Sequence, residues 1–467
     1  MLFNSIEFLV FLVVVLLVYH GSIPARFEVA RKAFLLAASY LFYMAWNPPF
    51  VLLLLASTLL DFTVAQRMSR ASGTARRRLL LALSLAGNLG LLCYFKYGNF
   101  VTENFYRLFG EWLGASAPPA LDIILPIGIS FYTFQTLSYS IDVYRGDQEP
   151  TRSLLDFALY VSFFPQLIAG PIVRSRDFLP QLVKRDRTHA VDVEVGLARI
   201  ATGLLKKVVL ADTLGSYVDP VFANPAGFPA LNLVLATYAY AYQIYFDFSG
   251  YSDMAIGLGR LFGFRIPENF DRPYRAANVR EFWRRWHISL STWLRDYLYV
   301  SLGGNRQGTV AVYMSLAVTM LLGGLWHGAS WTFVVWGAYH GVLLIAHRAA
   351  FGAMREDAKR TPLWLRQIVT FHLVCLGWIV FRAQTLGEAV TFVAGFGEAG
   401  FVASPLAIQA MVLLALSAGI HVVSESGRLR DRFAVRSAWV QGVGYAAIAL
   451  LVFLFSPATE RFIYFQF

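Results

Sequence analysis

Residues 308 to 331 read Gly308-Thr-Val-Ala-Val-Tyr-Met-Ser-Leu-Ala-Val-Thr-Met-Leu-Leu-Gly-Gly-Leu-Trp-His-Gly-Ala-Ser-Trp331. No charged residue interrupts this run before His327 near its end. A helix needs about 20 mostly apolar residues to cross roughly 30 Å of hydrocarbon. The stretch therefore predicts a membrane-spanning helix that carries one ionisable side chain, His327.

The rest of the chain has the same character, because 57% of the 467 residues are hydrophobic and only 15% are charged. Soluble domains have about 25% charged residues. The candidate spans are 5–20, 33–46, 49–66, 79–95, 99–114, 121–143, 154–170, 196–214, 229–248, 308–325, 331–349, 364–382, 388–403, 406–423 and 438–455. Several are too short to cross a membrane alone, which favours re-entrant or broken helices around a central cavity or tunnel. We predict an all-α, polytopic helical bundle that forms one membrane domain over residues 1–467.

The net charge of +11 could suggest a polyanion partner. The Lys and Arg residues lie mainly in short loops between apolar runs, however, which is the pattern that the positive-inside rule produces. We therefore expect contact with the lipid bilayer and no nucleic-acid partner. Anionic headgroups or an anionic acyl donor are compatible with this charge. The first apolar run lacks a basic start and a cleavage site, so we expect a retained helix.

The stretch from Arg275 to Tyr299 breaks the apolar pattern, because it mixes charged with aromatic residues. At helical spacing, one face would hold Phe282, Trp286, Ser289 and Trp293. Such a helix suits either a membrane interface or the wall of a polar cavity. Anchoring at an interface explains the Trp and Arg residues but explains His287 less well.

His327 and His287 are the candidate functional histidines. An ionisable side chain at membrane depth is expensive, so it predicts a functional site. Histidine also titrates near neutrality, which suits a general base. The alternative is a packing histidine that forms hydrogen bonds. Forty residues separate the two, enough for a hairpin to bring them together, and Gly323, Gly324 and Gly328 allow close helix approach or leave room for a ligand.

Other polar residues leave alternatives open. His340 and His347 could form a cluster or an interface pair, whereas a structural role is expected for His20, His189, His372 and His421. The interruption Phe246-Asp-Phe-Ser-Gly-Tyr-Ser-Asp253 fits either a broken helix that faces a cavity or a helix-end cap. The sequence has no Walker loop, nucleophile elbow or His-Glu-x-x-His motif, and we expect no metal.

Several motifs together resemble one family. They are Met1-Leu-Phe-Asn-Ser-Ile-Glu-Phe8, Ser162-Phe-Phe-Pro-Gln-Leu-Ile-Ala-Gly-Pro-Ile-Val-Arg174, Tyr245-Phe-Asp-Phe-Ser-Gly-Tyr-Ser-Asp253, Asn269-Phe-Asp-Arg-Pro-Tyr274, Phe282-Trp-Arg-Arg-Trp-His-Ile-Ser-Leu-Ser-Thr-Trp-Leu-Arg-Asp-Tyr297, Gly324-Leu-Trp-His-Gly-Ala-Ser-Trp331 and Phe462-Ile-Tyr-Phe-Gln-Phe467. Along essentially its whole length, the chain resembles the membrane-bound O-acyltransferase family, and most closely its branch in bacterial alginate O-acetylation systems.

This resemblance implies a helical bundle of the family's type and assigns roles to both histidines. His327 lies in the family's Trp-His-Gly motif and would promote attack of an acceptor hydroxyl on an acyl thioester. His287 would orient a reactant or stabilise charge on the thioester carbonyl. We further expect these residues to bind substrate: Trp326, Trp286, Asp253, Ser289 and Arg295.

The resemblance also implies the substrates and the location. We expect acetyl-CoA or an acyl carrier as donor, an exopolysaccharide such as alginate as acceptor, and no permanently bound cofactor. A periplasmic acetyltransferase of the SGNH type would be the partner protein, and the bacterial inner membrane the location. The polymer itself is left open. The alternatives are transfer of D-alanine, which Ala169 before Gly170-Pro171 disfavours, transfer of a longer acyl chain, and a transporter with structural histidines.

Overall fold

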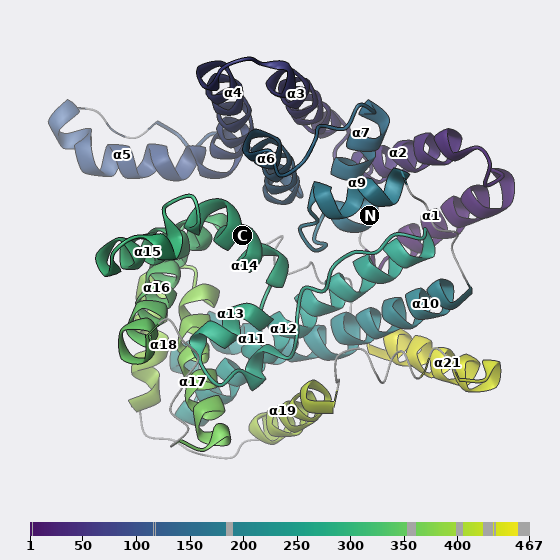
Figure 1. The fold of residues 1–467 in the computed structure, drawn as a ribbon. Helices are drawn as coiled ribbons and strands as arrows, with labels where there is room; N and C mark the ends of the chain where they lie inside the picture. Colours follow the sequence, from purple (N-terminus) through teal and green to yellow (C-terminus); the bar gives the residue numbers. More distant parts are fainter. Residues whose placement is uncertain are drawn as a thin grey trace. The chain divides into compact units, whose positions relative to one another are not determined.

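The computed structural model describes residues 1, 3–114, 116, 118–183, 190–352, 361–397, 405–423, 433 and 436–455. These residues form helices and no strand, which confirms the all-α prediction (Figure 1). They group into two compact units, Met1–Asp192 with Leu258–Pro267, and Val193–Gly257 with Glu268–Phe467. That both units belong to one domain over residues 1–467 stays a prediction.

The first unit is built from helices that follow the apolar runs of the N-terminal part. Its helices are α1 (Ile6–Leu16), α2 (Glu28–Met44), α3 (Val51–Arg70), α4 (Thr74–Leu92), α5 (Gly98–Leu113), α6 (Ile129–Arg145), α7 (Leu154–Ser162), α8 (Phe164–Leu167) and α9 (Ser175–Val183). The predicted span 154–170 is broken at Phe163, between α7 and α8, as the short apolar runs suggested.

Polar side chains join α3, α4 and α6 inside this unit. Asp61 of α3 is fully buried and accepts hydrogen bonds from Ser84 and Asn88 of α4 and from Ser140 of α6. The donor-to-acceptor distances from Asn88 and Ser140 are 2.7 and 2.6 Å. Because lipid tails do not drive apolar helices together, polar contacts of this kind hold membrane helices to one another.

The second unit holds both candidate histidines. Its helices are α10 (Ala190–Leu204), α11 (Asp212–Ala223), α12 (Ala230–Leu261), α13 (Val279–Arg285), α14 (Ile288–Trp293), α15 (Thr309–His327), α16 (Trp331–Phe351), α17 (Leu363–Arg382), α18 (Leu386–Ala394), α19 (Pro405–Val423) and α21 (Ala438–Phe455), with the first residues of α10 and the last of α12 in the other unit. Its core is aromatic and includes Tyr240, Phe282, Trp286, Trp336 and Trp378.

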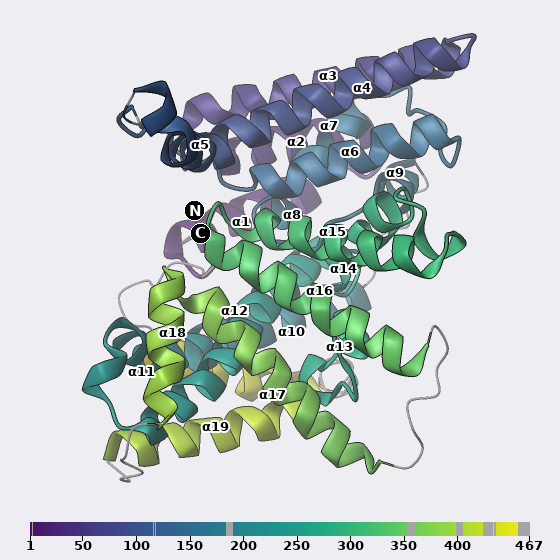
Figure 2. The same ribbon diagram turned by 90° about the vertical axis from the view of Figure 1, so that its left-hand side faces the viewer.

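Glycines bring two helix pairs into backbone contact. A Cβ atom on Gly250 of α12 would lie 2.8 Å from the carbonyl oxygen of Gly203 in α10. A Cβ atom on Gly324 of α15 would lie 3.0 Å from the Cα atom of Gly337 in α16, and these two helices lie side by side in Figure 2. Close helix approach is thus the role of Gly324, whereas Gly323 next to it lines a cavity.

Six helices among the described residues are long and apolar enough to cross a membrane: Pro48–Arg70, Thr74–Leu113, Thr309–His327, Leu363–Arg382, Pro405–Val422 and Ala438–Phe455. The chain is therefore a multi-pass membrane protein. The predicted spans 79–95 and 99–114 correspond to α4 and α5, which follow one another in one helical run, Thr74–Leu113. A π-helical turn, Cys93–Tyr97, carries the helix from α4 into α5.

Candidate functional site

The aromatic and basic segment folds as two short helices, α13 and α14. α13 begins at Asn278, whose side chain accepts a hydrogen bond from the backbone N–H of Glu281 at 2.8 Å. It ends at Arg285, and His287 then adopts a left-handed backbone conformation, with φ 41° and ψ 56°. The predicted single helix with Phe282, Trp286, Ser289 and Trp293 on one face is therefore wrong, although all four side chains are buried.

His287 is buried in this break, with 1% of its surface exposed. Its Nδ1 atom lies 3.1 Å from Oδ1 of Asn269. Its Nε2 atom is buried and has no hydrogen-bond partner among the described residues. The ring of Phe248 stands edge-on to the imidazole at 4.6 Å between centroids. Burial lowers the pKa of His287 well below its ordinary value, so the imidazole is neutral at neutral pH.

His327 is the last residue of α15 and is 4% exposed. Aromatic rings surround its imidazole edge-on, with Trp336 at 5.0 Å and Phe381 at 5.2 Å between centroids. The indole of Trp326 contacts both histidines, at 5.1 Å from the His327 ring and 5.8 Å from the His287 ring. The structure thus brings the two predicted histidines to one aromatic side chain, which was itself predicted to bind substrate.

A cavity of about 550 Å³ lies within the second unit and reaches His327. Its lining is formed by Arg280, Trp283, Arg284, Ile288, Leu290, Ser291, Thr292, Leu294, Arg295, Tyr299, Asn305, Leu316, Thr319, Met320, Gly323, His327, Trp336, Leu344, His347, Arg348 and Gly352. Volumes of about 300–1,000 Å³ are typical of small-molecule sites. The segment with mixed charge and aromatics therefore lines a cavity, which was one of its two predicted roles.

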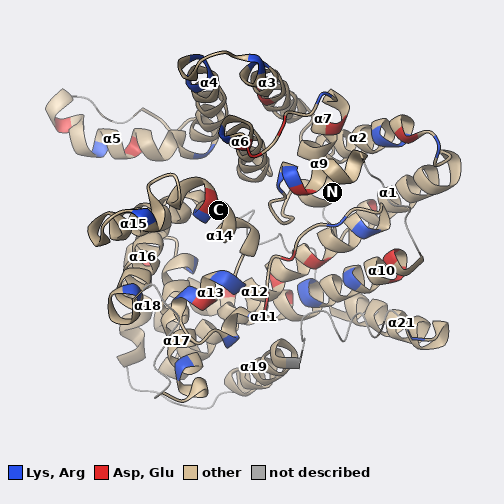
Figure 3. Cartoon of the chain, viewed as in Figure 1, with Lys and Arg blue, Asp and Glu red and all other residues tan. Residues whose placement is uncertain are grey.

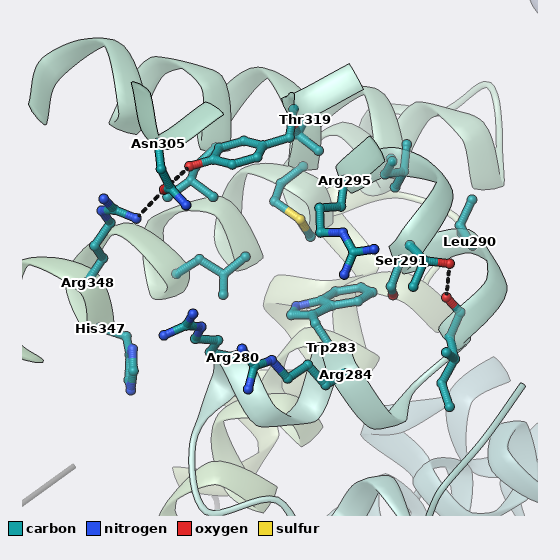
Figure 4. A pocket seen from close by; sticks show the side chains of 18 of the residues that line it. Arg280, Trp283, Arg284, Leu290, Ser291, Arg295, Asn305, Thr319, His347 and Arg348 are labelled. Carbon is teal, nitrogen blue, oxygen red and sulfur yellow. Dashed lines mark hydrogen bonds between the residues drawn. The ribbon is translucent and has the colours of Figure 1, made fainter. Parts of the chain in front are cut away.

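Four arginines make this cavity basic, and its described lining contains no carboxylate. Figure 4 shows Arg280, Arg284, Arg295 and Arg348 around the open space; the first two lie on α13, Arg295 follows α14, and Arg348 lies on α16. Arg348 donates a hydrogen bond to Oδ1 of Asn305 at 2.9 Å. Arg284 and Arg295 are exposed, whereas His327 and Trp336 are buried. A ligand in the cavity would thus meet positive charge at the exposed end and the histidine at the buried end.

Of the seven predicted site residues, His327 and Arg295 line the cavity, and the other five, all described, lie outside its lining. Trp286 is 1% exposed and packs on Trp378, with 4.8 Å between ring centroids. Ser289 donates a hydrogen bond from its hydroxyl group to Oδ1 of Asn269 at 2.9 Å. Substrate binding by Trp286 and Ser289 stays a prediction.

Asp253, another predicted substrate residue, belongs to a network of ion pairs. It pairs with Lys206 at 2.7 Å and with Arg199 at 3.4 Å, while Lys207 pairs with Asp247 at 2.7 Å. Lys206 and Lys207 lie in the π-helical turn Leu205–Ala211 that follows α10. Figure 3 colours basic and acidic residues on both α10 and α12. Because the carboxylates are neutralised from a neighbouring helix, α12 runs unbroken from Ala230 to Leu261. Both predictions for this stretch, a broken helix and a helix-end cap, are wrong.

The other histidines separate into different environments. His347 lines the cavity beside Arg348. His340 is fully buried against the rings of Trp336 and Trp283, at 4.9 and 5.2 Å between centroids. His189 lies outside the described residues. The predicted alternatives for His340 and His347, a cluster or an interface pair, do not describe this arrangement.

Sequence reasoning missed Asn269, Arg280, Arg284 and Arg348. Asn269 accepts hydrogen bonds from both Ser289 and the His287 turn. Its position in the Asn-Phe-Asp-Arg-Pro-Tyr motif was a usable signal, since a buried asparagine in a polar turn typically fixes backbone groups. No local signal shows which of the 40 Lys and Arg residues converge on one cavity.

Comparison with known proteins shows the family of this chain. Residues 148–387 match the membrane-bound O-acyltransferase family. The chain is 48% identical to a probable alginate O-acetylase of Azotobacter vinelandii, over 83% of this chain and 76% of that protein. It is 38% identical to a peptidoglycan O-acetyltransferase of Helicobacter pylori, over 78% of this chain and 73% of that protein. It is 30% identical to a teichoic acid D-alanyltransferase of Bacillus subtilis, over 57% of this chain and 71% of that protein.

The match covers α7 to α17 and so includes both histidines, Trp326 and the cavity. Buried histidines with an adjoining cavity are also the parts that acyl transfer needs, since the reaction requires a base and a place for the donor. The transporter alternative is thereby set aside. The chain belongs to the membrane-bound O-acyltransferase family and is an O-acyltransferase.

Proposed function

We propose that this enzyme transfers an acetyl group from acetyl-CoA, on the cytoplasmic side of a bacterial inner membrane, towards a hydroxyl group of an exopolysaccharide such as alginate. The observation that carries the proposal is the cavity that joins four arginines to His327. The names of the most similar relatives support the acetyl group and a cell-envelope polymer as acceptor.

The arginines favour a donor that carries phosphate groups. Guanidinium groups bind phosphate through paired, charge-assisted hydrogen bonds, and they stay charged at any physiological pH. Acetyl-CoA carries phosphates at one end and the reactive thioester at the other. Phosphates near Arg284 and Arg295 would place the acyl group deeper, towards His327. An acyl carrier protein with a phosphopantetheine arm is the alternative donor.

The reaction forms one ester and breaks one thioester. The acceptor oxygen bonds to the acetyl carbon, the carbon–sulfur bond breaks, and the hydroxyl proton ends on the sulfur of the departing thiol. His327 accepts the proton from the hydroxyl as the bond forms, which is worth about 10²–10⁴-fold in rate. Trp336 and Phe381 hold its ring in place and exclude water.

The acceptor side requires a partner in this proposal. The described helices form membrane spans and a cavity within one unit, and the acetyl group must continue to a polymer outside the membrane. We propose that a periplasmic acetyltransferase of the SGNH type takes it up. A D-alanyl group is the second candidate, which the 30% identity to a D-alanyltransferase supports.

The test replaces His327 by Ala in cells and measures ester-linked acetate and ester-linked D-alanine on the surface polysaccharide, after checking the level of protein in the membrane. We expect acetate to disappear from His327→Ala cells. The matched control is His372→Gln, at an exposed histidine outside the cavity, which should keep acetylation. Unchanged acetate in His327→Ala would refute the catalytic role, and loss of D-alanine in place of acetate would decide for the second candidate.

A second test addresses the donor. The double substitution Arg284→Ala and Arg295→Ala should raise the KM for acetyl-CoA of the purified enzyme in lipid nanodiscs at least tenfold, because each removes one phosphate-binding group. The control is Arg107→Ala, an exposed arginine in the other unit. An unchanged KM in the double variant, with folding intact, would contradict acetyl-CoA binding in this cavity.

A further inference from the structure

Asn269 connects three parts of the second unit through its side chain. The residue is 1% exposed and lies in the loop between α12 and α13. Its Oδ1 atom lies 3.2 Å from the backbone nitrogen of Ser289, 2.9 Å from the Ser289 hydroxyl and 3.1 Å from Nδ1 of His287. Its Nδ2 atom donates to the hydroxyl of Ser252 at 3.2 Å. Every polar atom of this side chain is therefore engaged.

These contacts decide which nitrogen of His287 carries the proton. A backbone N–H can only donate, so the Asn269 atom that faces Ser289 must be the oxygen. The same oxygen faces Nδ1 of His287, so Nδ1 must also be a donor and hold a hydrogen. A neutral imidazole has one N–H, which leaves Nε2 with a free lone pair. This lone pair is buried and has no partner among the described residues.

Asn269 also holds the backbone of the turn. Non-glycine residues seldom adopt a positive φ, and His287 does so at 41°. The backbone N–H of Ile288 donates to the carbonyl oxygen of Asn269 at 2.8 Å, and the N–H of Ser289 donates to its side chain. The backbone carbonyl of Asn269 thus holds Ile288, and its side chain holds Ser289. Together these two contacts fix the direction of the imidazole of His287.

We propose that Asn269 is a positioning residue for acyl transfer: it holds His287 in the tautomer protonated on Nδ1, so that Nε2 accepts a hydrogen bond from a hydroxyl group of the acceptor beside the one that attacks. An unprotonated Nε2 cannot donate to the thioester oxygen, so of the two roles predicted for His287, orienting a reactant is the one that this geometry allows. A hydroxyl group bound there would satisfy the buried lone pair.

This inference rests on the proposed role of the two histidines in acetyl transfer. In the reaction, the attacking hydroxyl forms the new carbon–oxygen bond and gives its proton to His327, the carbon–sulfur bond breaks, and the proton leaves with the thiol, as described above. His287 binds a neighbouring hydroxyl of the acceptor and so orients the attacking one. Asn269 touches neither substrate and acts only through His287.

The first test determines the tautomer directly and needs no activity. Nitrogen-15 solid-state NMR on the full-length protein in lipid, with ¹⁵N-labelled histidine, distinguishes protonated from unprotonated ring nitrogens. The signals lost in His287→Gln assign this residue among the eight histidines. We expect protonated Nδ1 and unprotonated Nε2 in the wild type, and a mixture of tautomers in Asn269→Leu. Protonated Nε2 in the wild type would overturn the proposal.

The second test separates positioning from folding. Asn269→Leu should lower kcat at least about tenfold, part of the roughly 10²–10⁴-fold that positioned proton-transfer groups contribute, and leave the KM for acetyl-CoA unchanged. Asn269→Asp keeps an oxygen towards Nδ1 and should recover most of kcat. Ser252→Ala is the matched control, since it removes only the fourth hydrogen bond of Asn269.

The outcomes of the two tests are distinct. If Asn269→Leu and Ser252→Ala lose kcat equally, or if Asn269→Leu keeps the wild-type tautomer and kcat, Asn269 has no positioning role. If no acetyl transfer from acetyl-CoA can be measured in the wild type, the proposed function fails, and the NMR result still decides the tautomer that Asn269 imposes.

Discussion

Gly324 of α15 and Gly337 of α16 face each other at backbone distance, with 3.0 Å between the position of a Cβ atom on Gly324 and the Cα atom of Gly337. This contact lies three residues before His327 and one residue after Trp336, which forms part of the cavity wall. The spacing of two backbones therefore sets the position of the candidate catalytic histidine.

We expect Gly324→Ala to destabilise the protein by about 1–3 kcal/mol, because backbone on both sides prevents the methyl group from being accommodated. Thermal unfolding of the purified protein in detergent measures this change. Gly419→Ala in α19 is the control, because no atom of the described residues lies within 4 Å of its added Cβ atom. Equal melting temperatures for the two variants would argue against close packing at Gly324.

The buried Lys207 should be far more important for stability than a basic residue whose acidic partner is exposed. Replacing Lys207 by Met leaves the carboxylates of Asp212 and Asp247 buried without their shared cation, at a cost of about 3–5 kcal/mol. The control is Arg382→Met, whose partner Asp219 is 48% exposed, with an expected cost of about 0–1 kcal/mol. Denaturant unfolding of both variants gives the comparison. A loss below 1 kcal/mol for Lys207→Met would show that the network is not buried as described.

Acidification should weaken the wild type more than His287→Gln. Because burial lowers the pKa of His287, the unfolded chain binds this proton before the folded protein does, and stability falls as the pH drops below about 6.5. The glutamine variant lacks this contribution. Its stability relative to the wild type should therefore improve by up to about 1.4 kcal/mol per pH unit below that value. Unfolding at pH 7.5 and pH 5.5 tests this, and parallel losses in both proteins would contradict it.

Salt should weaken donor binding if the arginines recognise phosphate. We expect the KM for acetyl-CoA to rise several-fold between about 50 and 200 mM salt, because mobile ions screen charges at the exposed Arg284 and Arg295. Acetyl-pantetheine lacks phosphates and serves as the control, so its KM should stay nearly constant over the same range. Equal salt dependence for both donors would place the phosphates outside the cavity.

Apolar runs were enough to predict most helices of this protein. The run from Gly308 to His327 predicted a span at 308–325, and the structure has α15 at Thr309–His327. Such a run carries its own signal, since most of its residues are apolar and prefer lipid to water. The same reasoning predicted two spans across residues 79–114, where the structure has α4 and α5, but it did not predict the π-helical turn Cys93–Tyr97 that joins them.

The candidate site was predictable only in part. His327 and Arg295 were identified and do line the cavity, and Trp326 contacts both histidines. The break at His287 was missed because its cause, Asn269, is 18 residues away in the sequence. The continuity of α12 was missed for the same physical reason, since the cations that neutralise its aspartates come from another helix. Local patterns cannot show partners that only the folded chain brings together.

The left-handed backbone at His287 affects how a mutational scan of this enzyme should be interpreted. An alanine at this position would lose the imidazole and also bear the steric penalty that L-residues with a Cβ atom suffer at positive φ. Asparagine and glycine tolerate this conformation better. A loss of activity in His287→Ala would thus combine the loss of the imidazole with destabilisation of the backbone. The variant His287→Asn would report on the imidazole alone.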